Sequence, residues 1–359
     1  MRDSHTIHPA FALGICLAAA AAGCARLPHA PPPVTPPEVL KVDSIRQDEP
    51  LPPLRAPEAM APLVRWAPAV PSEGTLVSLT IEEHPRSLPL LELWVRVGGE
   101  SIRLARLHDG AYLALVPAPI GAREIPVEIT AQFVDGASLQ QRLTLTVEAR
   151  EFPATRLTVA RRYTEPDEAT LRRIRREQQR VRAMLSTVTE MALWQGAFDR
   201  PVEGGPTAPY GQRRMFNGEL RSRHTGLDLR GSAGDPIRAA NSGRVALSDD
   251  LFFNGGAVFI DHGLGIYTGY FHMSRREVEE GEWVEQGQVI GRVGATGRVT
   301  GPHLHWSLYA LGQSLDPLSL LDPEFSAVAD RLPPPPLARV PWLSETASVG
   351  DGCEGRTCN

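Results

Sequence analysis

The segments R-H-T-G-L-D-L (residues 223–229) and G-P-H-L-H-W (residues 301–306) decide how the C-terminal part of this chain folds and what it binds. Together they supply two imidazoles and one carboxylate, from His224, His305 and Asp228. A catalytic zinc ion typically takes three nitrogen or oxygen ligands from the protein and keeps a fourth position for water, whereas structural zinc sites are closed and usually rich in cysteine. The three side chains therefore predict one zinc ion at an open, catalytic site.

The spacing within each segment supports this prediction. Residues two or four apart share a face of an extended strand. His303 and His305 should therefore point the same way. The same holds for His224 and Asp228, and the glycine between them, Gly226, favours a loop that enters a strand over a helix.

Further glycine-rich segments accompany these two in a fixed order between about residues 210 and 317. The ordered segments are Y-G-Q-R-R (210–214), H-T-G-L-D-L (224–229), G-Y-F-H-M-S (269–274), G-E-W-V-E-Q-G-Q-V-I-G (281–291) and G-A-T-G-R-V-T-G-P-H-L-H-W (294–306). With these segments the chain resembles the lysostaphin-type (LytM-type) zinc endopeptidases, which cut peptidoglycan peptides. The resemblance covers about a third of the chain.

Carried over residue by residue, the resemblance assigns the zinc ion to His224, Asp228 and His305. It makes His272 and His303 the histidines that hold the attacking water and transfer protons. The sequence contains no H-E-x-x-H motif whose glutamate would act as a base. An imidazole, whose pKa lies near neutrality, suits that task instead.

The resemblance leaves alternatives for the function. Some exported members of this family have lost metal ligands and act as non-enzymatic activators of cell-wall amidases. This chain keeps all the ligands, so the resemblance implies an active enzyme. The expected substrates are the D-alanyl–diaminopimelate cross-links between peptidoglycan stem peptides, with glycine bridges as the alternative. Another alternative is an envelope tether, in which the N-terminal domain binds a partner and the zinc domain is secondary.

The first 24 residues are typical of a bacterial lipoprotein signal. An apolar run at residues 10–22 ends in A-A-G-C at Cys24, and it is too short to span a bilayer, which needs about 20 residues. We predict export, a lipid on Cys24 and attachment to the periplasmic face of the outer membrane, because Ala25 stands where an aspartate would mark inner-membrane retention. The alternative is an ordinary cleaved signal with an incidental cysteine.

Two proline-rich stretches border the predicted folded parts. Residues 25–74 should form an extended, semi-rigid linker. Residues 324–359 should form an irregular tail. The tail holds Cys353 and Cys358, an even pair that predicts a small disulfide loop in an oxidising compartment.

Residues 75–159 show the alternation of apolar and polar side chains that is typical of β-strands. Asp109-Gly110 and Asp135-Gly136 lie between such runs, where hairpin turns belong. About six short strands predict a small antiparallel β-sandwich of immunoglobulin-like form. The region has no cluster of catalytic residue types, so we interpret it as a spacer or docking module.

Residues 164–192 should form an amphipathic helix, with Thr164 as its cap and arginines on its polar face. An exported protein with a net charge of −5 is a poor candidate for binding nucleic acid, so this basic face is expected to be solvated at a domain boundary. Residues 200–323 are dense in glycine and predict short antiparallel strands joined by tight turns, which form the zinc peptidase domain. The chain as a whole is thus expected to be mainly β.

Overall fold

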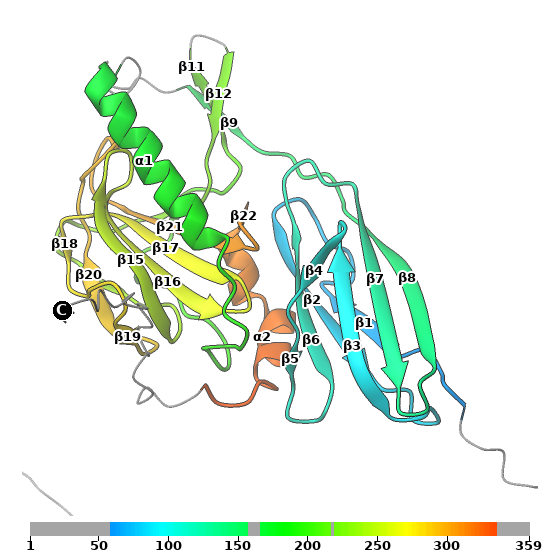
Figure 1. The fold of residues 1–359 in the computed structure, drawn as a ribbon. Coiled ribbons are helices and arrows are strands. Elements are labelled where there is room, and N and C mark those ends of the chain that lie inside the picture. Colours follow the sequence, from blue (N-terminus) through cyan, green and yellow to red (C-terminus); the bar gives the residue numbers. More distant parts are fainter. Residues whose placement is uncertain (1–57, 157–165, 217–218, 336–359) are drawn as a thin grey trace, which may run out of the picture. The chain divides into compact units, whose positions relative to one another are not determined.

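The computed structural model describes residues 58–156, 166–216 and 219–335 (Figure 1). Cys24 and the rest of the predicted signal, most of the predicted linker, and the pair Cys353 and Cys358 lie outside the described residues. The described chain consists mainly of β-strands, so the prediction of a mainly β fold is confirmed. None of the helices in these ranges is long and apolar enough to cross a membrane.

The N-terminal part of the described chain contains two four-stranded sheets, with the strand orders β1-β2-β6-β5 and β4-β3-β7-β8. The first sheet consists of β1 (Leu63–Ala67), β2 (Thr75–Glu82), β5 (Ala105–Arg106) and β6 (Tyr112–Ala118). The second consists of β3 (Leu90–Val97), β4 (Glu100–Ile102), β7 (Glu124–Phe133) and β8 (Ser138–Thr146). All pairings within them are antiparallel. The immunoglobulin-like form of this part stays a prediction.

The two predicted Asp-Gly turns lie where the chain reverses between paired strands. Gly110 (φ 90°) lies between β5 and β6, and Gly136 (φ 85°) lies between β7 and β8. Both glycines adopt the left-handed conformation, which costs a residue without a Cβ little. The carboxylates of Asp109 and Asp135 each accept a hydrogen bond from the amide two residues further on, which fixes the turn.

Strands β2 and β6 are buried on both faces, whereas β7 and β8 alternate between more and less buried positions. One face, with Val77 and Val116, packs between the two sheets. The other face, with Leu76, Leu113 and Leu115, joins the hydrophobic core of the C-terminal domain. A near-continuous apolar run is what a strand covered on both sides requires. The predicted spacer therefore shares a core with the domain that follows it.

Two predicted boundaries differ from the structure. Strand β1 lies inside the predicted linker, yet it pairs with β2 along its whole length, and Val64 packs on the core between the sheets. Strand β9 (Ala154–Arg156) lies in the predicted sandwich, yet it pairs in parallel with β11 (Arg213–Phe216) of the C-terminal domain. Both strands are short, and a short run of residues does not reveal by its pattern which sheet it joins.

The predicted helix is shorter than residues 164–192, since α1 spans Glu168–Leu185. Its N-cap is Asp167, whose carboxylate accepts a hydrogen bond from the backbone N–H of Thr170. The predicted cap, Thr164, is therefore wrong, and it lies outside the described residues. A carboxylate also interacts favourably with the positive end of the helix dipole, which is why aspartate is among the best caps.

The basic face of α1 is partly engaged with the C-terminal domain. Arg180 makes ion pairs with Asp249 and Glu280, and Arg173 donates a hydrogen bond to the backbone carbonyl of Asp250. These contacts join α1 to β15 (Gly243–Leu251) and its neighbourhood. Exposed ion pairs contribute little each, so the buried residues of α1 hold it in place and the arginines orient it.

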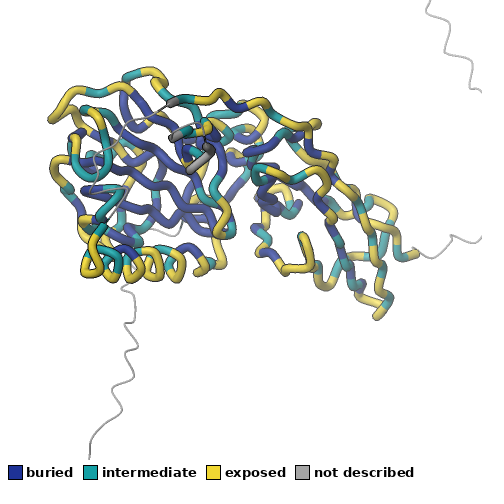
Figure 2. Tube along the Cα trace, turned by 90° about the horizontal axis from the view of Figure 1, so that it is seen from above, coloured by how far each residue is buried: buried dark blue, intermediate teal, exposed yellow. Residues whose placement is uncertain are grey.

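The C-terminal domain is built on an eight-stranded sheet with the order β10-β13-β21-β17-β16-β15-β19, in which β22 also pairs with β21. Besides β15, its strands are β10 (Pro206–Ala208), β13 (Leu227–Leu229), β16 (Gly255–Gly263), β17 (Ile266–Met273), β19 (Trp283–Val284), β21 (Leu304–Ala310) and β22 (Gln313–Leu315). All pairings are antiparallel, as predicted. Strands β16 and β17 are buried along their whole length and lie in the middle of the domain (Figure 2).

Two three-stranded sheets complete this domain. One has the order β12-β11-β9 and contains β12 (Glu219–Arg223). The other has the order β14-β20-β18 and consists of β14 (Pro236–Arg238), β18 (Arg275–Arg276) and β20 (Val289–Arg292). The first of these sheets leads directly into the candidate metal site, because His224 follows the last residue of β12.

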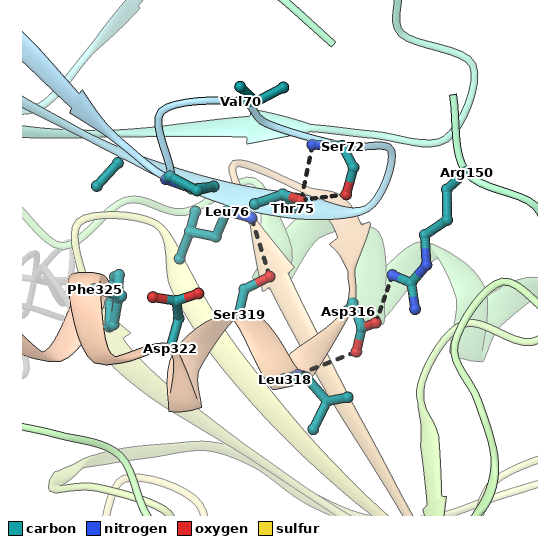
Figure 3. Close-up of a pocket in the computed structure, with 12 residues that line it drawn as sticks. Val70, Ser72, Thr75, Leu76, Arg150, Asp316, Leu318, Ser319, Asp322 and Phe325 are labelled. Carbon is teal, nitrogen blue, oxygen red and sulfur yellow. Dashed lines mark hydrogen bonds and ion pairs between the residues drawn. The ribbon is translucent and has the colours of Figure 1, made fainter. Parts of the chain in front are cut away.

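The chain after β22 is helical and packed, although the predicted irregular tail begins there at residue 324. A 3-10 helix, η2 (Pro317–Leu321), is followed by α2 (Pro323–Ala329). Phe325 of α2 is buried in the core of the domain. The Ser319 hydroxyl of η2 accepts a hydrogen bond from the backbone N–H of Leu76 in β2 (Figure 3). The first residues of the predicted tail therefore complete the shared core.

We expect Phe325→Ala to lower the free energy of unfolding by about 3–5 kcal/mol, because removing a large buried side chain leaves a cavity. Phe325 is 4% exposed, and its ring centroid lies 6.2 Å from that of Phe198. Chemical denaturation measures the change. Glu324→Gln, at the neighbouring exposed position of α2, should change the free energy of unfolding by less than about 0.5 kcal/mol. Equal effects of the two variants would contradict the packing described for α2.

Candidate metal centre

The side chains of His224, Asp228 and His305 converge on one point at the β13 end of the large sheet. Asp228 lies in β13 and pairs directly with His305 in β21. Directly paired residues of antiparallel strands point to the same face of the sheet. His224 lies in the loop between β12 and β13, as Gly226 predicted, so this loop and not a shared strand face brings His224 to Asp228.

The three candidate ligand atoms form a small triangle. His224 Nε2 lies 2.9 Å from Asp228 Oδ1 and 2.9 Å from His305 Nδ1. His305 Nδ1 lies 2.8 Å from Asp228 Oδ1. All three residues are buried. The structure thus brings together the three residues that the sequence proposed as ligands, with one atom of each facing the other two.

The second nitrogen of each ring indicates the form of the ligands. His224 Nδ1 donates a hydrogen bond to the backbone carbonyl of Pro209, at 2.8 Å. Because a carbonyl oxygen can only accept, His224 carries its proton on Nδ1 and has a lone pair on Nε2. His305 Nε2 lies 3.0 Å from the Ser307 hydroxyl, which likewise leaves Nδ1 as the inward-facing atom. Electron-pair donors that face one another in a buried site fit a bound cation.

The electrostatics of the site favour the metal-binding forms of these groups. Burial opposes ionisation of Asp228, but the adjoining imidazoles of His224 and His305 outweigh it and lower the pKa of the carboxyl. Burial lowers the pKa of His305 to about 4, against the opposing effect of the Asp228 carboxylate. At neutral pH the centre therefore presents a carboxylate and a neutral imidazole, and two imidazoles with one carboxylate fit zinc.

Two further histidines lie beside the centre. His272 Nδ1 donates to the backbone carbonyl of Thr296, and His303 Nδ1 donates to that of Gly301, each at 2.9 Å. The two ring centroids are 5.1 Å apart. His303 Nε2 lies 3.6 Å from Asp228 Oδ1. Both rings thus hold their proton on Nδ1 and keep a lone pair on Nε2, which is the form that accepts a hydrogen bond or a proton.

His272 is held in an uncommon backbone conformation. Its φ is 66°, in the left-handed region that side-chain-bearing residues seldom adopt. Thr296 supports it, because the Thr296 carbonyl accepts from the ring and the Thr296 hydroxyl donates to the carbonyl of Met273. Burial lowers the pKa of His272 to about 3, and the neighbouring imidazoles of His305 and His303 add to this effect. The ring is therefore neutral at physiological pH.

Gly226 is needed for the close approach of its loop to β21. A Cβ atom at this position would lie 2.5 Å from His305 Nε2 and 2.6 Å from the Ser307 hydroxyl oxygen. The sequence indicated a glycine loop here but not its reason. The sequence also did not reveal that the Pro209 carbonyl binds the His224 ring or that Ser307 binds the His305 ring. A backbone acceptor and a serine two residues after a histidine form no recognisable motif.

Comparison with known proteins agrees with this geometry. Residues 222–317 match the model of peptidase family M23. Peptidoglycan DD-endopeptidase ShyC of Vibrio cholerae is 40% identical over 124 residues, which are 34% of this chain and 28% of that protein. DD-carboxypeptidase/endopeptidase Mpg of Neisseria meningitidis is 38% identical over 117 residues, which are 33% of this chain and 27% of that protein. The chain thus matches about a quarter of the length of these curated relatives.

A solved structure from Pseudomonas aeruginosa, described as an M23 peptidase, is similar over a longer stretch. It is 26% identical with a TM-score of 0.53, and the similarity covers 70% of this chain and 94% of that one. The C-terminal part of this chain is therefore an M23 (LytM-type) peptidase domain, and the predicted resemblance is confirmed.

We expect the protein to bind zinc and His305→Ala to lose it, because the variant removes one of three ligands and its hydrogen bond to Ser307. Elemental analysis of protein freed of loose metal by gel filtration measures the content. His84→Ala, far from the centre in sequence and in a turn of the N-terminal part, should keep wild-type zinc. Full zinc occupancy in His305→Ala would show that the ion binds at another place in the protein.

Proposed function

We propose that this protein is a zinc-dependent endopeptidase that hydrolyses peptide cross-links of peptidoglycan, with the D-alanyl–diaminopimelate bond as its substrate. The observation that carries the proposal is the convergence of three candidate ligand side chains on one point, with two further imidazoles beside it. Members of one protein family can differ in activity, so the site carries the proposal and the family supports it.

Peptide hydrolysis at neutral pH needs a strong nucleophile and stabilisation of the oxyanion that forms. Zinc, when bound, lowers the pKa of water from about 15.7 to roughly 7 and polarises the scissile carbonyl. His272 and His303 have lone pairs on Nε2 that orient the attacking water and accept its proton. His303 Nε2, which lies 3.6 Å from Asp228 Oδ1, then donates the proton that it has accepted to the leaving amine.

The proposed substrate draws on the relatives. The Vibrio protein is named a peptidoglycan DD-endopeptidase and the Neisseria protein a DD-carboxypeptidase/endopeptidase. A D-alanyl–diaminopimelate cross-link joins two D-centres, whereas a glycine bridge contains none. The presence of all three ligands favours an enzyme over a non-enzymatic activator of amidases, which would have no need of them.

Digestion of purified cell walls tests the proposal. The zinc-loaded protein should convert cross-linked dimers from diaminopimelate-type walls into monomers, which mass spectrometry of the released muropeptides identifies by mass. Walls with glycine bridges serve as the matched comparison. Cleavage of only the walls with glycine bridges would make glycine bridges the substrate. Cleavage of neither type of wall would favour the alternative of a non-enzymatic activator of amidases.

We expect His303→Ala and His272→Ala to keep zinc and to lower kcat by about 10²–10⁴-fold, the usual contribution of a positioned proton-transfer group. Neither ring is a ligand, so metal content should not change. Steady-state kinetics on a cross-linked dimer, with elemental analysis of the same samples, measures both quantities. Near wild-type rates would mean that the chemistry is misassigned, and loss of zinc would make one of these residues a ligand.

We further propose that the protein is a lipoprotein anchored through Cys24 at the periplasmic face of the outer membrane. The apolar run that ends in A-A-G-C supports this proposal. An anchor followed by a proline-rich stretch would hold the enzyme at the membrane, and the extended stretch would let the enzyme reach the cell wall.

We expect Cys24→Ser to move the protein from the membrane fraction to the soluble periplasmic fraction, because the thiol that would carry the lipid is gone. Cell fractionation followed by immunoblotting measures the distribution. Cys16→Ser is the matched control, since Cys16 lies in the apolar run that cleavage removes. Unchanged membrane association of the Cys24 variant would contradict the anchor.

A further inference from the structure

Arg214 is a cation on the hairpin that leads into the metal centre. It lies in β11, where it pairs with Ser222 of β12. Paired residues of antiparallel strands share a face, and so do residues two apart in an extended segment. The backbone N–H of His224 still donates across the hairpin to the carbonyl of Gln212. Because Ser222 and His224 are two apart, Arg214 is placed on the same side of the hairpin as His224.

The guanidinium of Arg214 has no protein partner among the described residues. Its Nε is buried without a hydrogen bond, and no carboxylate of the described chain forms an ion pair with it. Its neighbours differ. Arg223 donates to the carbonyl of Gly211 and lies over the ring of Phe152, and Arg213 is exposed. A buried donor without an acceptor is costly, and an unpaired buried charge more so. Such a group calls for a partner that the folded chain does not supply.

The electrostatics place this cation within range of the metal centre. Burial lowers the pKa of the Arg214 guanidinium, and the charge of Asp228 partly opposes that effect. The charge of Arg214 also contributes to the lowered pKa of His305, after the larger effects of burial and of the other ligands. Arg214 therefore lies within electrostatic range of two candidate ligands without bonding to either.

We infer that Arg214 binds the free carboxylate of the substrate on the carbon bonded to the scissile nitrogen. This inference rests on the proposed function. Diaminopimelate carries an amino group and a carboxylate on the α carbon at each of its two ends. When one amino group forms the cross-link, the carboxylate on the same carbon stays free and lies two bonds from the scissile nitrogen. The planar guanidinium matches a carboxylate with two parallel hydrogen bonds.

Arg214 thereby becomes a specificity-determining residue. A peptide bond inside a glycine bridge has no carboxylate at this position, so it leaves the half-buried guanidinium and its buried Nε unpaired. A site built to bond a charged group rejects an analogue that lacks the group, because its own buried polar atoms then lose their partner. Arg214 also lies before the residues that match the M23 family model, 222–317, so the family match does not assign it this role.

Two purified muropeptide dimers test the inference. They are identical except that one has the free carboxylate beside the scissile nitrogen and the other has a carboxamide there. Wild type should cleave the carboxylate dimer with a kcat/KM about 10- to 100-fold higher, the range of one charge-assisted hydrogen-bond pair. Arg214→Gln should lower kcat/KM for the carboxylate dimer by the same factor and leave the carboxamide dimer almost unchanged. Arg213→Gln, at the exposed neighbouring position, should retain the wild-type preference.

Two further measurements separate binding from folding and from chemistry. Zinc content and the melting temperature of Arg214→Gln report whether the centre is intact. Calorimetric affinity for the carboxylate dimer, measured in a His303→Ala background where turnover is slow, should fall about 10- to 100-fold with Arg214→Gln. If Arg214→Gln does not fold, equal cleavage of the two dimers by wild type would still overturn the inference.

The outcomes distinguish this inference from the proposed function. Equal cleavage of both dimers by wild type would overturn the role of Arg214 and leave the endopeptidase intact. An equal loss on both dimers in Arg214→Gln would likewise overturn it, because Arg214 would then support the fold or the metal centre. Cleavage of neither dimer by zinc-loaded wild type would overturn the proposed function itself.

Discussion

Three buried electron-pair donors, with His224 Nε2, Asp228 Oδ1 and His305 Nδ1 no more than 2.9 Å apart, are the constraint on which the C-terminal domain depends. Without a cation or a proton between them they would repel, so the fold must hold them by other means. Pairing of β13 with β21 places two of them opposite each other, and the carbonyl of Pro209 fixes the third. The strands that form the sheet are thus the scaffold of the site, which suits a centre that needs precise geometry.

The same sheet places the two histidines that we propose as proton-transferring groups. Strand β17 is the next neighbour of β21, and its residue Phe271 pairs directly with His305. The following residue, His272, departs from strand geometry with a φ of 66°, and Thr296 holds its ring. His303 lies one residue before β21 begins, and β21 is the strand next to the one that carries His272. The candidate ligands and these two histidines therefore come from neighbouring strand ends, which fixes their separation without a long loop.

The sequence was enough to identify the three candidate ligands that the fold brings together and to predict the general fold, because zinc ligands are restricted to few residue types and alternation marks strands. The sequence was not enough where contacts with residues distant in the chain determine the structure of a segment. Strand β1 looked like linker because prolines surround it, and α2 looked like tail because a proline run follows it. The cap of α1 was misplaced because Thr164 and Asp167 are both good caps. The sequence did not single out Arg214, because it does not show which of the many arginines lacks a partner in the folded chain.

The N-terminal sheets are more than a spacer for this site. Strand β9 follows them in the chain and pairs in parallel with β11, the strand that carries Arg214. Leu113 and Leu115 of β6 cover core residues of the peptidase domain that would otherwise meet water. At about 25 cal/mol per Å² of apolar surface, such cover is a large part of the marginal stability of a domain. Removing the N-terminal part would therefore leave one side of β11, the strand of Arg214, unpaired and would expose the core of the peptidase domain. Arg214 and the candidate metal ligands thus depend, to different degrees, on a part of the described chain in which we place no catalytic group.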